Sequence, residues 1–197
     1  MVNFIPDARK TKKKPIDLNK LRQGDLVFFK PIVCFDWKDP LGFFISKLIS
    51  FFSSITIHVA PIVNDPTLTG EVKIFSAEGT GMELRVIALC DCYYFMRIKG
   101  ATQDDIKQGI IKSYERYWGK SYGFLTAIKA GVFRKLGLRS LYIKHMLPTC
   151  SYHSAMFVID VMEKNPVPSI PQSEVLPDDL YKSKLLEEIT KEQESTP

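Results

Sequence analysis

Hydrophobic and polar positions predict a first half that is rich in strands. Short runs of β-branched and aromatic residues, each bounded by Gly, Pro, Asn or Asp, are typical of strands. Such runs occupy residues 26–33, 55–63, 72–77, 82–89 and 93–98. Most of the connections are short, which favours antiparallel pairing over a parallel sheet with crossover helices. We therefore expect an antiparallel sheet of about five strands, arranged as a meander or a partial barrel.

The second half shows helical periodicity. Thr102 and Asp105 have the spacing of a capping box, and apolar residues follow them at helical intervals. A second helix is predicted over about 124–136, and a third begins at Cys150 with Thr149 as its candidate N-cap. The fold class is therefore α+β, with the sheet packed against helices in a single domain.

Charge separates the two ends of the chain from this domain. The formal net charge is +5, and residues 1–20 hold six Lys or Arg against two Asp, so nearly all of the excess lies there. A nucleic-acid binder more often carries a basic face on its folded part, and we expect no nucleic-acid partner. The sequence predicts a flexible basic arm at 1–20, a domain at 21–183 and a charged tail at 184–197 that frays.

The most apolar stretch, residues 41–63, has Lys47 and His58 as its ionisable groups. Its length could span a bilayer. Its serines, Pro61 and β-branched second half instead favour a buried helix over about 41–52 that leads into a strand. A peripheral membrane or lipid contact stays open through four aromatic side chains: Phe43, Phe44, Phe51 and Phe52.

Cysteine usage points to a reducing compartment. Cys34, Cys90, Cys92 and Cys150 are too few for a disulfide framework in a chain of 197 residues, and they form no C-x-x-C pair. The first twenty residues contain no apolar segment of a secretory signal. We expect a cytoplasmic protein, or one that joins an assembly made in the cytoplasm.

Two residues have the setting of a nucleophile and a base. Cys150 lies in the first turn of a predicted helix, where unpaired N–H groups and the helix dipole lower a thiol pKa. His58 interrupts an apolar strand. A strand would hold a general base in the fixed position that a Cys–His pair needs. The structural alternatives are a buried cysteine acting as a small hydrophobe and a hydrogen-bonded core histidine. Ser76 and Glu78, two apart on one strand, are candidates for orienting the imidazole.

A metal site has weaker support. Cys150 and His153 have C-x-x-H spacing, and His145 is nearby, but there is no second pair of ligands at zinc-binding spacing. The sequence also lacks a phosphate-binding loop and a dinucleotide fingerprint. We expect no metal and no cofactor.

These features together resemble the circularly permuted papain-like hydrolases. Within them the chain is most similar to the YiiX/YebB-like branch, which is related to NlpC-type amidases and to lecithin:retinol acyltransferase-like enzymes. The resemblance covers about residues 21–183. It rests on six short segments in the family's order: Gly24-Asp25-Leu26-Val27, Ile57-His58-Val59, Ala77 with Gly81-Met82, Lys120-Ser121-Tyr122, Cys150-Ser151, and Leu176-Pro177-Asp178-Asp179-Leu180 with Ser183.

The resemblance implies a cysteine hydrolase that forms an acyl-enzyme without a cofactor. The nucleophile falls on Cys150 and the general base on His58. The family often has Glu directly before the alanine of the strand, where this chain has Ser76, and Glu78 is a possible replacement. An amide or peptide substrate is the first expectation. Hydrolysis or transfer of a lipid acyl chain, and a non-catalytic binding or structural module, are the alternatives.

Overall fold

A computed structural model describes most of the domain. The described residues are 16–30, 58–78, 81–89, 93–120, 150–170, 172 and 175–189. Within helices and strands, nothing is described of the side chains at positions 77, 78, 81, 150 and 151. The basic arm as far as residue 15 and the helices predicted at 41–52 and 124–136 lie outside the described residues, as do Phe43, Phe44, Phe51, Phe52, Thr149 and His145.

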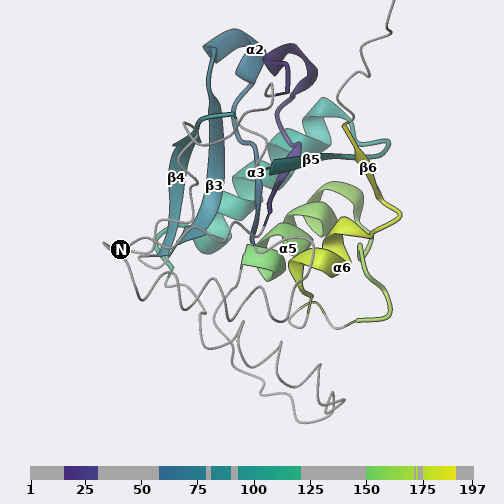
Figure 1. The fold of residues 1–197 in the computed structure, drawn as a ribbon. Coiled ribbons are helices and arrows are strands. Elements are labelled where there is room, and N and C mark those ends of the chain that lie inside the picture. Colours follow the sequence, from purple (N-terminus) through teal and green to yellow (C-terminus); the bar gives the residue numbers. More distant parts are fainter. Residues whose placement is uncertain are drawn as a thin grey trace, which may run out of the picture.

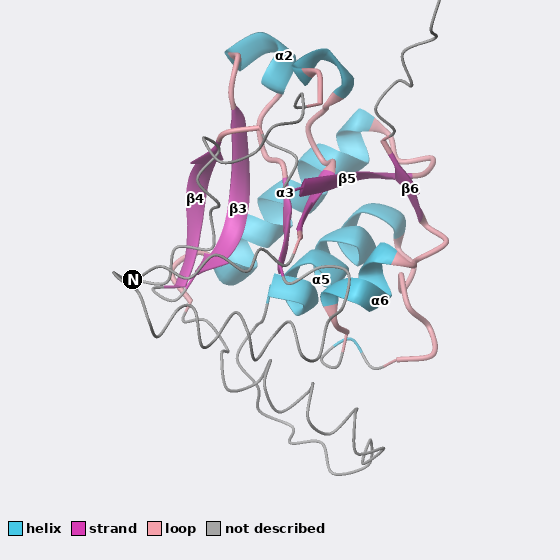
Figure 2. Ribbon diagram, in the orientation of Figure 1, coloured by secondary structure: helices cyan, strands magenta, loops and turns pink. Residues whose placement is uncertain are grey.

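The described part is an α+β fold (Figures 1 and 2). Its strands are β1 (Leu26–Phe29), β2 (His58–Pro61), β3 (Val72–Glu78), β4 (Gly81–Ile87), β5 (Tyr93–Ile98) and β6 (Leu186–Glu188). Its helices are η2 (Leu18–Lys20, a 3-10 helix), α2 (Pro66–Thr69), α3 (Gln103–Tyr117), α5 (Cys150–Met162) and α6 (Pro177–Tyr181). None of the helices in these ranges has the length and apolar character needed to cross a membrane.

Strand pairing differs from the single sheet of about five strands, a meander or a partial barrel, that the sequence predicts. One antiparallel sheet has the order β2-β1-β5-β6, and β3 and β4 form a separate two-stranded sheet (Figure 2). The first strand lies between the second and the fifth, with Phe29 opposite both His58 and Tyr93. Side-chain alternation predicts which face of a strand is buried, but it does not say which strands are neighbours. The strand positions were therefore predictable, whereas the order was not.

Both faces of the four-stranded sheet are covered, which explains why β1 is apolar throughout. Val27 and Phe29 face the β3–β4 hairpin, in a core with Val72 and Ile74. Leu26 and Phe28 belong to the opposite core, which the helices α3, α5 and α6 cover. The domain thus has three layers: hairpin, sheet and helices. All four β1 side chains are buried, as this arrangement requires.

Helices α3 and α5 pack closely against each other. The predicted capping box of α3 is confirmed, because Thr102 Oγ1 accepts from the Asp105 N–H while the Asp105 carboxylate accepts from the Thr102 N–H. Gly109 allows the close approach, since a Cβ atom there would lie 2.6 Å from a methyl group of Val161. An ion pair at 2.8 Å also joins the two helices, between Arg116, about two turns after Gly109 on α3, and Asp160, next to Val161 on α5.

The fold extends past the predicted domain boundaries at both ends. Ile16, in the predicted arm, is buried in the hairpin-side core. Strand β6, in the predicted charged tail, pairs with β5 and places Leu186 opposite Ile98. The prediction that this part of the tail frays is wrong, because backbone pairing and the burial of Leu186 hold it. Its three residues are too few to show strand periodicity among charged neighbours.

Candidate functional site

His58 begins β2 at one end of the four-stranded sheet. Its neighbour across the strand pair is Phe29, and the two rings meet edge to face with centroids 4.8 Å apart. Only 2% of the His58 surface is exposed. Residues directly opposite each other in a sheet share a face. The imidazole therefore points, like Phe29, toward the β3–β4 hairpin.

Ser76 supplies a hydrogen bond to this buried imidazole. It lies near the end of β3, is fully buried, and its Oγ atom is 2.8 Å from Nε2 of His58. A buried imidazole that lacked a hydrogen-bond partner would be destabilising, so this contact fixes the ring as well as stabilising it. If Nε2 carries the proton, it donates to Ser76 and leaves Nδ1 as the basic nitrogen.

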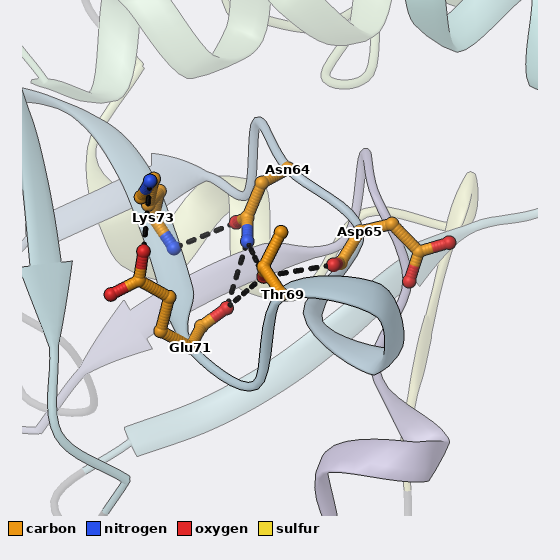
Figure 3. A network of polar contacts seen from close by, with 5 residues as sticks. All are labelled: Asn64, Asp65, Thr69, Glu71 and Lys73. Carbon is orange, nitrogen blue, oxygen red and sulfur yellow. Dashed lines mark hydrogen bonds and ion pairs between the residues drawn. The ribbon is translucent and has the colours of Figure 1, made fainter.

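A polar network fixes the connection that brings β3 to β2. Asn64 accepts from the Lys73 N–H at 2.7 Å and donates to the Glu71 carbonyl at 2.8 Å and to Thr69 Oγ1 (Figure 3). The Thr69 hydroxyl also donates to the Asp65 carbonyl, and the Lys73 ammonium pairs with the Glu71 carboxylate (Figure 3). Lys73 is the second residue of β3 and lies three residues before Ser76. The turn therefore helps to set where Ser76 meets His58.

Helix α5 begins at Cys150, where the sequence predicts the start of a helix. Its second turn is attached to the His58 strand, because the Ser154 hydroxyl donates to the carbonyl of Val59 at 3.1 Å. Position 150 lies one helical turn before Ser154 on the same side of the helix. The side chain of Cys150 itself lies outside the described atoms.

His153 has surroundings that its place in the sequence does not reveal. Its ring is completely buried, with edge-to-face contacts to Phe75 and Tyr117 at 5.0 and 5.1 Å. Among the described residues, neither ring nitrogen finds a hydrogen-bond partner. Burial, followed by the nearby charges of His58 and Arg116, lowers the pKa of His153 to about 3. His153 is therefore neutral at ordinary pH, and it lies within electrostatic range of His58.

Of the two predicted orienting residues, Ser76 is the one with a described contact to His58. Glu78 ends β3 opposite Gly81, and its side chain lies outside the described atoms. Across the hairpin Ser76 is directly opposite Glu83, a carboxylate that the sequence alone suggests is simply solvated. The register between β3 and β4, which the sequence does not reveal, places Glu83 next to Ser76.

The first segment of the family resemblance has a structural role here. Gly24 adopts a φ of 90°, and a Cβ atom at that position would lie 2.5 Å from Ile106 of α3. Asp25 is buried and accepts from Arg97 through two nitrogens, each at 2.9 Å, and from the Arg22 N–H. Burial raises the pKa of Asp25, although these hydrogen bonds act in the opposite direction. These residues secure the start of β1 against β5 and α3.

The last segment of the resemblance also stabilises local structure. Asp179 accepts from the Leu176 N–H at 3.0 Å, which completes the first turn of α6. Ser183 donates to the Pro166 carbonyl at 2.6 Å and thereby ties the end of α6 to the preceding loop. Both contacts position α6 beside α5 in the helical layer.

Metal-binding groups do not gather in the described part of the chain. Among the residues described there, no cluster of three or more His, Cys, Asp or Glu has the arrangement needed to hold an ion. Comparisons of the chain with family models, curated proteins and solved structures find no match. The function must therefore be inferred from the site's own residues.

Proposed function

We propose that this protein is a cysteine hydrolase that cleaves an amide or peptide bond. Cys150 is the nucleophile, His58 is the general base, and Ser76 is the positioning residue of His58. The observation that carries this proposal is the buried hydrogen bond between His58 Nε2 and Ser76 Oγ, at 2.8 Å. It holds an imidazole on a rigid strand with one nitrogen fixed, which is the geometry that a general base needs.

The attachment of α5 supports bringing position 150 to His58. Ser154 bonds to Val59, the neighbour of His58, and His153 lies within electrostatic range of His58 itself. Both residues are about one turn beyond Cys150 on the helix. The helix starts one turn, or about 5.4 Å, before Ser154, which supports a first residue close to the imidazole.

The chemistry follows from these positions. In the tautomer whose Nε2–H donates to Ser76, Nδ1 of His58 takes the proton of the Cys150 thiol, and the thiolate attacks the substrate carbonyl. The N–H groups in the first turn of α5 have no partners within the helix and are suited to stabilise the oxyanion. The protonated His58 then gives its proton to the leaving amine, and a thioester to Cys150 remains.

A water molecule completes the cycle. His58, neutral again, accepts a proton from this water as the water oxygen attacks the thioester carbonyl. The tetrahedral intermediate expels the Cys150 thiolate, and the product is a carboxylic acid. His58 and Cys150 then share one proton, as at the start. The two steps consume one water and release an amine and an acid, without a metal or cofactor.

A substrate screen with acyl-enzyme trapping tests this proposal. Wild type, Cys150→Ala and the matched control Cys34→Ala are incubated with pooled peptide, ester and thioester substrates, and adducts are mapped by mass spectrometry. We expect turnover of amide or peptide substrates and an acyl adduct on Cys150, both lost in Cys150→Ala and kept in Cys34→Ala.

Three other results would contradict the proposal. Equal activity of the wild type and Cys150→Ala would remove Cys150 as nucleophile. Turnover confined to lipid acyl esters would replace the amide hydrolase by the acyl-lipid alternative. Absence of both turnover and adduct across the screen would favour a non-catalytic binding module.

A further inference from the structure

The one-turn helix α2 presents an uncharged, exposed tip. Thr67, Leu68, Thr69 and Gly70 are all exposed, and Leu68, at 83%, is the most exposed of the large hydrophobic residues that the structure describes. Pro66 at the start of the helix is buried, and its carbonyl accepts from the Gly70 N–H at 2.9 Å. Single exposed leucines are common on protein surfaces. Leu68 therefore becomes informative only through its surroundings.

The polar groups of this tip are already hydrogen-bonded within the turn. The N–H and the hydroxyl of Thr67 both donate to the Asp65 carboxylate, at 3.0 and 2.7 Å. The N–H and the hydroxyl of Thr69 both donate to the Asp65 carbonyl, at 3.2 and 3.0 Å (Figure 3). Moving a polar group out of water costs less when its hydrogen bond is made inside the protein. The tip can therefore leave water together with Leu68.

A strongly basic stretch of the chain enters the domain beside this tip. Residues 9–20 hold six Lys or Arg against one Asp, and five of these cations fall within residues 9–14, the basic run. The chain joins the fold at the buried Ile16 and continues as η2, which packs beside α2 (Figure 1). Two residues of chain span at most about 7 Å. The basic run therefore ends next to η2 and α2, at the same end of the molecule as Leu68.

This combination is complementary to the surface of a bilayer that contains anionic lipids. Clusters of Lys and Arg are attracted to such a surface, and an apolar side chain beside them can enter the headgroup region. The acidic residues near the tip are Asp17, Asp65 and Glu71, of which Glu71 pairs with Lys73 at 2.8 Å. The cations of the basic run outnumber them, so the net charge of this end is positive.

Nucleic acid is a poorer match for the same surface. Proteins contact phosphates with free N–H and hydroxyl donors as well as with cations, but the donors of Thr67 and Thr69 are used within the turn. Single strands are held by aromatic side chains on which bases stack, and residues 66–70 contain none. An exposed leucine among uncharged neighbours suits lipid better than a polyanion alone.

We propose that the end of the molecule formed by α2, η2 and the basic run binds the surface of an anionic lipid bilayer, with Leu68 among the headgroups. The basic run supplies the electrostatic attraction, and Leu68 supplies the apolar contact. Strand β3 leads away from α2 and rises about 13 Å between Val72 and Ser76. Docking in this way keeps the candidate site off the bilayer. The proposal does not depend on the hydrolase chemistry.

Vesicle co-sedimentation tests this proposal. The full chain is mixed with vesicles of phosphatidylcholine alone, or of phosphatidylcholine with roughly 30% phosphatidylserine, in about 50 or about 500 mM NaCl. We expect binding to the phosphatidylserine vesicles in low salt. Affinity should be roughly tenfold or more weaker without the anionic lipid, and weaker again in high salt, which screens exposed charges.

The variant Leu68→Ser tests the apolar contact. It should weaken binding to phosphatidylserine vesicles roughly threefold to tenfold and leave the salt dependence unchanged, because no charge is altered. Ile111→Ser is its matched control, since Ile111 is an exposed apolar residue of α3, 48% exposed, and should have no effect. Circular dichroism verifies that each variant folds.

A triple variant tests the electrostatic contribution. Replacing Lys12, Lys13 and Lys14 with Gln should remove most of the preference for anionic lipid. The matched control removes the same number of charges at exposed positions of the helical layer and should keep that preference; its replaced residues are Lys112, Lys164 and Lys182. Equal losses in the two triple variants would overturn the proposal, because net charge alone would then explain the binding.

Three further results would overturn the proposal. The first is an absence of binding to phosphatidylserine vesicles in low salt, and the second is binding that ignores lipid charge. The third is an equal effect of Leu68→Ser and Ile111→Ser, which would remove α2 from the interface. Single-stranded poly(U) RNA is measured alongside, and tighter binding to it than to the vesicles, unchanged by Leu68→Ser, would make the basic run a nucleic-acid contact instead.

Discussion

The Nε2 atom of His58 lies 2.8 Å from the Oγ atom of Ser76, and both side chains are buried between the sheet and the hairpin. The contact joins two strands of different sheets. Two features fix the position of this hydrogen bond. The turn at Asn64 holds the start of β3, and pairing with β1 holds β2. A polar contact in this place holds an imidazole in one orientation, which links the fold to the proposed chemistry.

Replacing Ser76 with Ala should reduce both activity and stability. The variant loses one buried hydrogen bond, about 1–3 kcal/mol, and leaves His58 without its fixed orientation. We expect kcat/KM to fall about ten- to hundredfold and the acid limb of its pH profile to shift.

A matched control for this variant exists in α3. Ser113 is also buried, but its hydroxyl has no hydrogen-bond partner within the described part of the chain, so Ser113→Ala should leave both kcat/KM and its pH profile unchanged. Ser76→Thr keeps the hydroxyl and should retain most of the activity. Equal effects of Ser76→Ala and Ser113→Ala would argue against a positioning role for Ser76.

His153 should make the fold acid-sensitive. Its pKa is about 3 in the folded chain against 6.5 for an ordinary histidine, because burial disfavours the charged ring. Below pH 6.5 the unfolded chain binds a proton that the folded chain does not. Stability is therefore fully present above pH 6.5 and falls by up to about 1.4 kcal/mol per pH unit toward pH 3.

The variant His153→Leu removes this titration. Urea unfolding of wild type and variant between about pH 7.5 and pH 4 should give free energies of unfolding whose difference grows in favour of the variant as the pH falls. Taking the difference cancels the titration of other groups. Parallel pH profiles for the two proteins would mean that His153 is not held neutral in the fold.

Adding a side chain at position 109, where α3 contacts α5, should destabilise the domain. An alanine at position 109 would place its Cβ atom 2.6 Å from the Val161 Cγ2 atom and 3.2 Å from the Phe157 ring. We expect Gly109→Ala to cost about 1–3 kcal/mol in the free energy of unfolding, although alanine ordinarily favours a helix over glycine.

The partner substitution Val161→Ala removes the methyl group in the way. The double variant should therefore be less destabilised than the sum of the two single variants. Gln108→Ala, at an exposed position of the same helix, should be close to neutral. Additive effects of Gly109→Ala and Val161→Ala in urea unfolding would contradict the close approach.

Removing Arg97 should leave Asp25 as an uncompensated buried charge. Asp25 is 2% exposed and accepts two hydrogen bonds from Arg97, so Arg97→Met should cost about 2–4 kcal/mol at neutral pH. The loss of the guanidinium raises the Asp25 pKa further, so the cost should shrink as the pH falls and Asp25 becomes protonated. Arg97→Met combined with Asp25→Asn should recover stability at neutral pH, and a lack of recovery would contradict this role.

The sequence predicts the local elements of this fold better than their pairing. Alternation and apolar runs place β1 to β5, the Thr102 capping box places the start of α3, and Cys150 opens α5 as expected. These are local properties of neighbouring residues. The pairing of β5 with β6 joins a segment from the middle of the chain to one near its end, and nothing local in Leu186–Glu188 indicates it.

The same distinction applies to the candidate site. His58 stands out in the sequence because a polar residue interrupts an apolar strand, but Ser76 and Glu78 are equally placed by alternation alone. The choice of Ser76 depends on the register between two sheets. His153 lies on a helix, where its spacing gives no sign of its surroundings. Its complete burial arises from packing against Phe75 and Tyr117, with no hydrogen-bond partner among the residues that the structure describes.

The most direct measurement is the thiol pKa of Cys150. In a chain with Cys34, Cys90 and Cys92 replaced by Ser, the alkylation rate of Cys150 with iodoacetamide is followed from about pH 4 to pH 10. We predict an apparent thiol pKa below 7, which His58→Ala shifts toward the value of about 8.5 for free cysteine. A pKa near 8.5 in the parent chain that His58→Ala leaves unchanged would contradict the Cys150–His58 pair.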